Sequence, residues 1–394
     1  GRAREAAVEF ERVLQAQPAN ASAHAAAGVA YAAQRAWDQG IAHLERARAI
    51  EPANARYTLA LADTLLKAGR DDRARVVVAE IERTAEQSPE LLVTLATVLA
   101  QNNRYADALA LFEKAIGRGQ KDFDAQYGLG FALYKLGRPK EAERPLKLAT
   151  ELKPVRADGH FALGLVYETL GNDDEAVASF AVAARLDPSL AEAYFEAGQI
   201  YVKHGKYENA ISAFTRATIS SPRSSLYQAA LGDAYFYLGQ FDRAQEAYAR
   251  AYALDPASHN INYRIGQYNL KLGRYPEAEE YLKREARLHP DFVESFARLG
   301  EMYSQLFRDA EAESALAQAL ALAPNHTPAL FLMGRLRVRQ QRFDEAKQAF
   351  KRVEELDPAN AQVHYQLFLI YRRAGDRELA AKELEIFQKM ERSK

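Results

Sequence analysis

The sequence predicts an all-α solenoid, an array in which pairs of helices stack one on the next. Three observations lead to this prediction. Prolines and small residues recur every 34 residues, each period contains two apolar stripes with helical spacing, and the register never slips along the 394 residues. A solenoid grows by adding repeats, so a chain of this length need not divide into separate globular domains.

Proline and the small residues show the period most plainly. Seven prolines follow one another at intervals of 34 residues: Pro154, Pro188, Pro222, Pro256, Pro290, Pro324 and Pro358. A second column contains only glycine or alanine: Gly28, Ala62, Ala96, Gly130, Gly164, Gly198, Gly232, Gly266, Gly300 and Gly334. A partial unit, 1–20, therefore precedes eleven complete units, from 21–54 to 361–394.

Each unit is predicted to contain two helices. In the unit 191–224, a first apolar stripe ends before Gly205, a residue suited to a helix C-terminus, and a second stripe ends before Pro222. The stripe residues have helical spacing: Tyr194, Ala197, Gly198 and Tyr201, then Ala210, Phe214 and Ala217. Small residues on both helices allow a close approach, and larger neighbours fill the remaining space. One unit cannot bury both of its faces, so neighbouring units must stack.

These columns resemble the tetratricopeptide repeat. In 225–258 the family's signature positions are occupied by Leu231, Gly232, Tyr235, Gly239, Phe241, Ala244, Tyr248, Ala251 and Pro256. The resemblance covers the whole chain and implies a right-handed superhelix of about 11.5 repeats, whose concave groove is lined mainly by the first helices. It implies one solenoid over 1–394: the second helix of a truncated repeat (1–20), ten full repeats (21–360) and a capping repeat (361–394).

The two ends of the chain differ in character. The opening residues resemble the loop between the two helices of a unit, so we expect a fragment of a longer protein that lacks the partner helix. In the last unit, small or polar residues stand where a following unit would pack: Ala381, Glu385 and Gln388. A polar outer face is what a terminal repeat needs for solubility.

Composition excludes several classes of protein. There are 52 Lys and Arg against 53 Asp and Glu, and this balance argues against a nucleic-acid-binding protein. There is no cysteine, hence no disulfide or thiolate metal site. No apolar run approaches the roughly 18 residues of a membrane span. Cytoplasm and periplasm both remain open, and a repetitive style rich in Ala, Arg and Gln is typical of bacterial proteins.

No catalytic constellation is recognisable. The eight histidines form no HExxH motif, and there is no phosphate-binding GxxxxGK[ST] loop or GxSxG elbow. The run Asp173-Asp174-Glu175 opens a second helix, where acidic side chains are favoured by the helix dipole. We therefore expect no enzyme activity, no catalytic residues, no metal site and no cofactor.

Aromatic side chains are the leading candidates for ligand contact. The resemblance places the second, fifth, ninth, twelfth and thirteenth positions of each unit in the groove, and seven candidates stand at such or neighbouring positions: Tyr127, Phe131, Tyr134, Phe161, Phe195, Phe236 and Tyr237. Aromatic rings anchor partners through a large buried area at low entropic cost. The alternative is ordinary repeat packing, because aromatic residues are common at these positions in the family.

Basic residues form the second candidate group. Lys203 shares the thirteenth position with Lys67, Lys135 and Lys271, where the alternative is a solvated groove edge. We expect Arg335, Arg339, Arg372 and Arg373 to form a basic patch suited to carboxylates or phosphates. Residues 157–258 carry 7 basic and 13 acidic groups, whereas 327–394 carry 14 and 10. Such a polar groove would bind an extended peptide in one direction.

Three residues break columns that are otherwise buried and apolar: Asn269, Glu285 and Arg337. A buried charge needs a partner. We therefore expect an interior ion pair for Glu285, with Arg264 and Arg298 available on adjacent first helices. A structural role is one reading, and a site that determines specificity is the other.

The leading functional hypothesis is a monomeric interaction scaffold that binds an extended peptide or a partner helix of another protein in the groove. One alternative is an appendage of a larger enzyme or membrane-anchored assembly factor whose working domain lies upstream of residue 1. A second is a self-association module.

Overall fold

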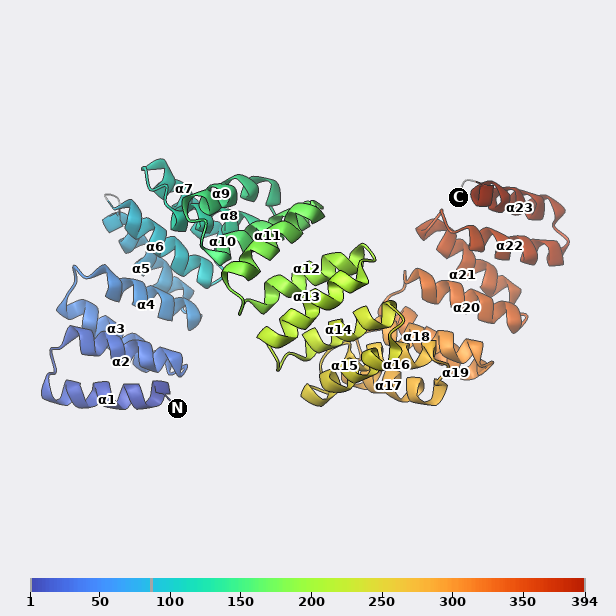
Figure 1. The fold of residues 1–394 in the computed structure, drawn as a ribbon, viewed down its shortest axis with the longest axis horizontal. Helices are drawn as coiled ribbons and strands as arrows, with labels where there is room; N and C mark the ends of the chain where they lie inside the picture. Colours follow the sequence, from blue (N-terminus) through green and yellow to red (C-terminus); the bar gives the residue numbers. More distant parts are fainter. Residues whose placement is uncertain (1, 86–87, 393–394) are drawn as a thin grey trace. The chain divides into compact units, whose positions relative to one another are not determined.

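A computed structural model describes residues 2–85 and 88–392 and divides the chain into two compact units, one ending at Ile200 and the other beginning at Tyr201. Each unit is described by itself. Within the described residues there are 23 α-helices and no strand, which confirms the predicted all-α class (Figure 1). The boundary between the units falls inside α12 (Ala191–Lys203).

The first unit contains one unpaired helix followed by helix pairs. Its helices are α1 (Arg2–Ala16), α2 (Ala21–Ala33), α3 (Trp37–Ile50), α4 (Ala55–Lys67), α5 (Asp71–Thr84), α6 (Pro89–Gln101), α7 (Tyr105–Gly117), α8 (Phe123–Lys135), α9 (Pro139–Leu152), α10 (Ala157–Thr169) and α11 (Asp173–Leu186). The first of these helices, α1, precedes the first complete helix pair and packs against α2.

The second unit continues the same alternation. After α12 its helices are α13 (Tyr207–Ser220), α14 (Ser225–Tyr237), α15 (Phe241–Leu254), α16 (Ile261–Lys271), α17 (Tyr275–Leu288), α18 (Val293–Gln305), α19 (Asp309–Leu322), α20 (Thr327–Arg339), α21 (Phe343–Leu356), α22 (Ala361–Ala374) and α23 (Arg377–Arg392). Even-numbered helices are the first helices of the 34-residue repeats, and odd-numbered helices are the second.

The predicted punctuation sets the helix ends. A second helix stops two residues before its proline, as α13 does before Pro222 and α17 before Pro290. In the turn between the two helices of a repeat, one residue adopts a left-handed backbone conformation. Glycine occupies this place at Gly171 (φ 78°), whereas Gln341 adopts the same conformation with φ 60°. The turn geometry is therefore kept even where the residue is not the favoured glycine.

The small-residue columns mark where paired helices touch. A Cβ atom added to Gly164 of α10 would lie 2.6 Å from the Phe180 ring of α11, and one added to Gly334 of α20 would lie 2.7 Å from the Phe350 ring of α21. Both phenylalanines are fully buried. The predicted close approach is confirmed, because a large second-helix side chain fills the space that a first-helix side chain would need.

Neighbouring repeats share their cores. One cluster of buried side chains combines Leu282 of α17, Met302 of α18, Leu316 of α19 and Leu336 of α20. First helices of successive repeats also contact one another, as in α4 with α6, α6 with α8, α14 with α16 and α18 with α20. In each unit, several successive first helices thus lie side by side (Figure 1).

Each helix within 2–85 and 88–392 is too short or too polar to cross a lipid bilayer.

Candidate functional site

A pocket of about 530 Å³ opens across three consecutive first helices of the second unit. We call it the α14–α18 pocket. It is lined by Phe236 and Tyr237 from α14, Gln267, Leu270 and Lys271 from α16, and Arg298, Glu301, Met302 and Gln305 from α18. Most of these residues stand at the ninth, twelfth and thirteenth positions of their repeats, which the resemblance places in the groove.

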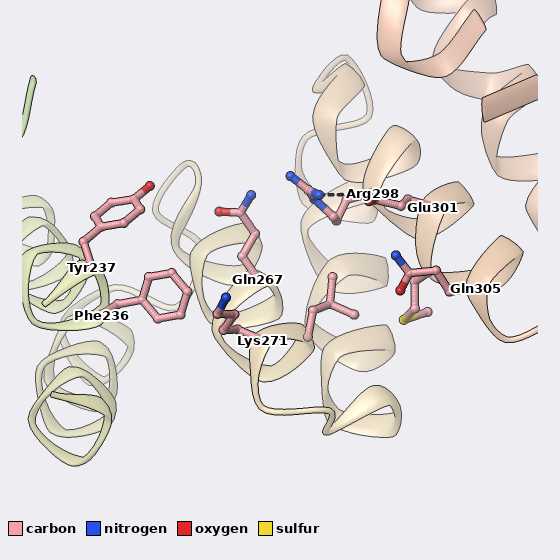
Figure 2. Close-up of a pocket in the computed structure, with 9 residues that line it drawn as sticks. Phe236, Tyr237, Gln267, Lys271, Arg298, Glu301 and Gln305 are labelled. Carbon is pink, nitrogen blue, oxygen red and sulfur yellow. Dashed lines mark hydrogen bonds and ion pairs between the residues drawn. The ribbon is translucent and has the colours of Figure 1, made fainter. Parts of the chain in front are cut away.

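Figure 2 shows how the lining side chains are distributed. Phe236 and Tyr237 form one wall, Gln267 and Lys271 project from the middle helix, and Arg298 and Glu301 form the opposite wall. The Arg298 guanidinium donates to the Glu301 carboxylate, so this wall is polar without excess charge. The pocket therefore combines an aromatic side with a polar side.

The two aromatic residues of the pocket are held differently. Phe236 is partly buried and meets the Tyr268 ring edge-on at 6.3 Å, whereas Tyr237 is 56% exposed and stacks on Tyr207 with ring centroids 5.5 Å apart. The predicted candidates Phe236 and Tyr237 are thus brought together, with one ring fixed in the wall and the other open to solvent.

In the first unit, the predicted candidates on α8 form a ladder of rings. Tyr127 stacks on Phe123 at 5.4 Å and on Phe131 at 5.8 Å, and Phe131 meets Tyr134 at 6.3 Å. The Lys135 ammonium lies 5.3 Å from the Phe131 ring. Residues three and four apart lie on one helical face, which explains why these side chains meet.

Much of this ladder is already occupied by intramolecular contacts. Burial raises the pKa of the Tyr127 hydroxyl to about 12, and the Asp158 carboxylate adds to this shift while Arg156 opposes it. Arg156 also covers the Phe123 ring at 4.4 Å. Phe161 is partly buried, and its ring centroid lies 5.6 Å from that of the fully buried Phe180. Tyr127 and Phe161 therefore contribute to packing as well as to any contact surface.

Phe195 is partly buried on α12, next to an unusual carboxyl group. Burial raises the pKa of Glu196 to about 7, and the nearby carboxylates of Glu168 and Glu192 raise it further. This side chain titrates near neutral pH, so the charge of the first-helix face changes there.

The predicted basic residues do not behave as one group. Arg339 pairs with Asp309 and donates to the Ser304 carbonyl at 2.9 Å, so its charge is already compensated. Arg372 covers the Phe368 ring and Arg373 covers a different aromatic ring on α21. No ion pair joins Arg335 to another described residue, and its side chain is exposed. Arg335 therefore differs from Arg339, whose charge is compensated by another described residue.

Lys203 is exposed at the C-terminal end of α12. The twelve predicted site residues are thus distributed over both units, and only Phe236 and Tyr237 line the α14–α18 pocket.

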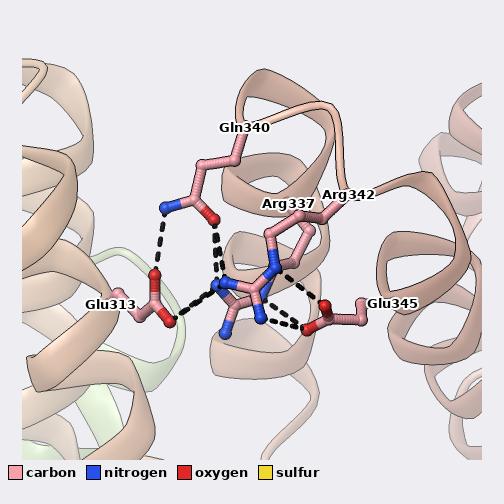
Figure 3. A network of polar contacts seen from close by, with 5 residues as sticks. All are labelled: Glu313, Arg337, Gln340, Arg342 and Glu345. Carbon is pink, nitrogen blue, oxygen red and sulfur yellow. Dashed lines mark hydrogen bonds and ion pairs between the residues drawn. The ribbon is translucent and has the colours of Figure 1, made fainter.

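Arg337, one of the three column-breaking residues, is 12% exposed and lies in a network of charges between repeats (Figure 3). Its guanidinium lies 2.7 Å from Glu313 and 3.3 Å from Glu345, and it donates to Gln340. Hydrogen bonds from Gln340 and Arg337 lower the pKa of the Glu313 carboxyl group. Arg342 contacts both acids as well. The network links α19, α20 and α21, so this departure has a structural role.

The expected partners of Glu285 were wrong. Arg264 pairs with Asp233, and Arg298 pairs with Glu301. The Glu285 carboxylate instead accepts from the Asn260 backbone N–H at 2.8 Å, just before the start of α16. The sequence showed that Glu285 lies in a buried column but did not show which groups its side chain would meet.

Sequence reasoning also left most of the pocket out of its candidate list. Gln267, Lys271, Glu301 and Gln305 stand at groove positions, but they are ordinary polar residues. The signal that could have found them is their position in the repeat. Consecutive first helices carry an aromatic pair, a lysine and several polar residues at the ninth to thirteenth positions.

Comparison with models of known protein families identifies the repeats. Residues 154–364, more than half of the chain, match the family model of the Cilia and flagella-associated protein 70 C-terminal domain. Two tetratricopeptide-repeat models match residues 31–96 and 93–154. Arrays of this family generally act as non-catalytic scaffolds for protein interaction.

Similar individual proteins cover this chain to different extents. A segment of 90 residues is 38% identical to Cellulose synthase operon protein C of Pseudomonas fluorescens, and it makes up 23% of this chain and 7% of that protein. Yeast Tom70 has a TM-score of 0.53 at 14% identity, covering 98% of this chain and 96% of its own. A tetratricopeptide-repeat protein from Parabacteroides merdae has a TM-score of 0.54 at 17% identity, covering 64% and 99%.

These structural likenesses concern the fold alone, and they agree with the repeat columns and the paired helices. The chain belongs to the tetratricopeptide-repeat family.

Proposed function

We propose that this chain is a non-catalytic scaffold that binds an extended peptide segment of a partner protein across its first helices, with the α14–α18 pocket as the principal contact. The observation that supports this proposal is the lining of the pocket. Three successive first helices contribute apolar, cationic and paired polar side chains at positions that line the groove in this family.

The lining indicates what kind of peptide would fit. Phe236 and Leu270, which are partly buried, offer an apolar surface for one large side chain, and the buried Met302 lies behind this surface. Lys271 is exposed and forms no ion pair within the described residues, so it can pair with a carboxylate of the ligand. An apolar anchor with an acidic residue nearby is the expected motif. On α20, Arg335 offers a second cationic contact to a longer segment.

A displayed peptide library tests the proposal directly. The chain is used for selection, and the enriched peptides are then measured against two variants, Tyr237→Ala and Lys271→Glu, each confirmed by circular dichroism to be folded. We expect enriched sequences to combine an aromatic or long aliphatic residue with acidic residues. Lys271→Glu should weaken binding by about tenfold, equivalent to about 1.4 kcal/mol.

Lys135→Glu is the matched control, because Lys135 holds the same repeat position on α8 of the first unit. Equal losses for Lys271→Glu and Lys135→Glu would show that charge alone attracts the peptide. A loss with Lys135→Glu only would place the site on the α8 ladder instead. Failure to enrich any sequence would argue against peptide binding.

A second candidate is a role as one segment of a larger assembly factor. The observation favouring it is the similarity to a short segment of Cellulose synthase operon protein C, a protein many times longer than the matched residues. Sequencing the complete reading frame would test it: a catalytic or anchoring domain on the same polypeptide would support this role, and a reading frame that ends with the repeats would contradict it.

A further inference from the structure

Glu285 is a carboxylate in a position that repeat packing reserves for small side chains. The equivalent residue is Ala251 in the preceding repeat and Ala319 in the following one, and both are fully buried. Glu285 is also 0% exposed. A carboxylate removed from water is costly unless positive charge or several hydrogen bonds compensate it. The groups around the Glu285 carboxylate therefore indicate how its charge is compensated.

The contacts of this carboxylate leave it only partly satisfied. Oε1 accepts from the Asn260 backbone N–H at 2.8 Å, whereas Oε2 has no hydrogen-bond partner in the described structure. Two imidazoles face the same group: His289 Nε2 lies 3.9 Å and His259 Nδ1 lies 4.0 Å from Oε1. These distances are too long for hydrogen bonds, but one donor atom from each of the three residues lies within 4.8 Å of the other two.

The backbone around this group is irregular in a way that brings the ligands together. The first helices α14 and α18 begin at the first residue of their repeats, whereas α16 begins at the third, Ile261. His259 and Asn260 therefore lie outside the helix, and Asn260 adopts a left-handed conformation with φ 69°. Without this delayed start, His259 would be part of the first helical turn.

The second histidine comes from the same helix end as the carboxylate. His289 directly follows the last residue of α17, four residues after Glu285, and its Nε2 lies 3.9 Å from the Glu285 carboxylate. The His259 and His289 rings meet edge-on, with centroids 4.7 Å apart. His289 Nε2 also lies 3.1 Å from the Ala257 carbonyl oxygen, a contact that a ligating nitrogen would give up.

We propose that His259, Glu285 and His289 form a binding site for one divalent first-row transition-metal ion, with Zn²⁺ as the best match. Two imidazole nitrogens and one carboxylate oxygen form a donor set that suits zinc and its neighbours. His259 is 54% exposed at the mouth of the site, so water can complete the coordination. Because Zn–N and Zn–O bonds measure about 2.0–2.1 Å, tetrahedral donors lie about 3.4 Å apart. Each histidine nitrogen would therefore need to approach the Glu285 oxygen by roughly half an ångström from the observed 3.9 and 4.0 Å.

The other acid–histidine cluster of the described residues has a different character. His364 Nδ1 already forms a 2.8 Å hydrogen bond with Glu383, and Glu354 is the third member. Both paired groups are buried, so this pair is complete without an ion. The site at Glu285 differs in having two imidazoles, an unpartnered carboxylate oxygen and an open side.

An ion in this site would join the C-terminal end of α17 to the segment that precedes α16. Because α16 carries Gln267 and Lys271, the ion would fix the start of a helix that lines the α14–α18 pocket. The metal site itself does not depend on the proposed peptide binding, and its test uses no peptide.

The experiment titrates the metal-free full chain with Zn²⁺ by calorimetry and with Co²⁺ by visible spectroscopy, at neutral pH. We expect one tightly bound ion per chain, an absorption spectrum of tetrahedral or five-coordinate Co²⁺ with nitrogen and oxygen ligands, and a melting temperature that rises with Zn²⁺ and falls back with chelator. His259→Ala should weaken binding by tenfold or more with little effect on folding, because His259 lies outside the helices.

Glu285→Ala separates a metal ligand from a structural residue. Alanine is the residue that neighbouring repeats use here, so this variant should melt no lower than the metal-free wild type while losing the response to Zn²⁺. His160→Ala is the matched control, since its imidazole also contacts a backbone carbonyl, that of Pro154. A full chain that binds no ion, or ion binding left unchanged by both His259→Ala and Glu285→Ala, would overturn the proposal.

Discussion

The α8 ladder of the first unit and the α14–α18 pocket of the second both present aromatic side chains at groove positions, yet they use them differently. On α8 the rings stack on one another, and burial raises the pKa of Tyr127 to about 12. In the pocket, Tyr237 is 56% exposed beside Lys271, which forms no ion pair within the described residues. Aromatic residues at groove positions are therefore stacked on one another on α8, whereas in the pocket one of them remains open to solvent.

The two units also differ in how strictly they keep their columns. Asn269, Glu285 and Arg337, the three departures noted in the sequence, all fall in the second unit. Each departure has its own local solution: Asn269 donates to the Ile265 carbonyl, Arg337 joins a charge network, and Glu285 faces two imidazoles. Small and apolar residues in a regular column need only complementary shapes to pack, whereas a polar or charged residue in a buried column needs specific hydrogen-bond or ion-pair partners.

The largest effect is expected from filling the close contact between the two helices of a repeat, which occurs in each unit. Gly164→Val and Gly334→Val each place new atoms in space held by a buried phenylalanine, and each should lower the free energy of unfolding by about 3 kcal/mol. Urea unfolding followed by circular dichroism measures this. Gln199→Val and Lys351→Val, at exposed helical positions, serve as controls. A tolerated valine in one unit alone would show that the two units differ in their helix packing.

The next effect concerns a broken column. Arg337→Ala removes the centre of the charge network and should cost about 2 kcal/mol, because the nearly buried arginine side chain loses its packing and two partly exposed acids lose a partner. Arg337→Tyr restores the residue found at this position in the repeats of Tyr303 and Tyr371, and should cost less than half as much. Thermal melts of both variants provide the comparison. Equal losses would mean that the charge, rather than the filled space, matters.

A smaller effect should depend on pH and distinguish the first unit. The folded pKa of Glu196 is about 7, above the usual value of 4.5, so the folded state holds its proton more tightly than the unfolded state. Its contribution to stability therefore decreases as pH rises from about 4.5 to 7, by about 1 kcal/mol for a partly buried group. Glu196→Gln should remove this dependence in melts at pH 5 and pH 8. A wild-type difference that persists in the variant would assign the titration to another group.

The smallest effect is expected in the turns. Gln341→Gly relieves a left-handed conformation and should stabilise the second unit by about 0.5 kcal/mol, whereas Gly171→Ala should destabilise the first by about 1 kcal/mol. The sign of each change in melting temperature is the measurement. A destabilising Gln341→Gly would show that the side chain contributes a contact worth more than the backbone strain.

Sequence reasoning reached the fold more completely than the site. The columns predicted each helix pair, the helix ends before Pro222 and Pro290, and the close approach of the two helices of a repeat. The site was harder because a repeat position states only which face a residue lies on. It does not state whether a ring such as Tyr127 will be covered by its neighbours or a charge such as Arg339 compensated by another repeat.

By itself, the sequence determined the repeat, the pairing of helices and the positions that face the first-helix layer, because these follow from local periodicity and from small residues at fixed intervals. Only the tertiary structure decided which side chains meet across repeats. His259 reaches Glu285 because α16 begins two residues late, and Arg264 turns to Asp233 instead. Such contacts depend on side-chain direction and on small shifts of helix ends, which a 34-residue period cannot encode.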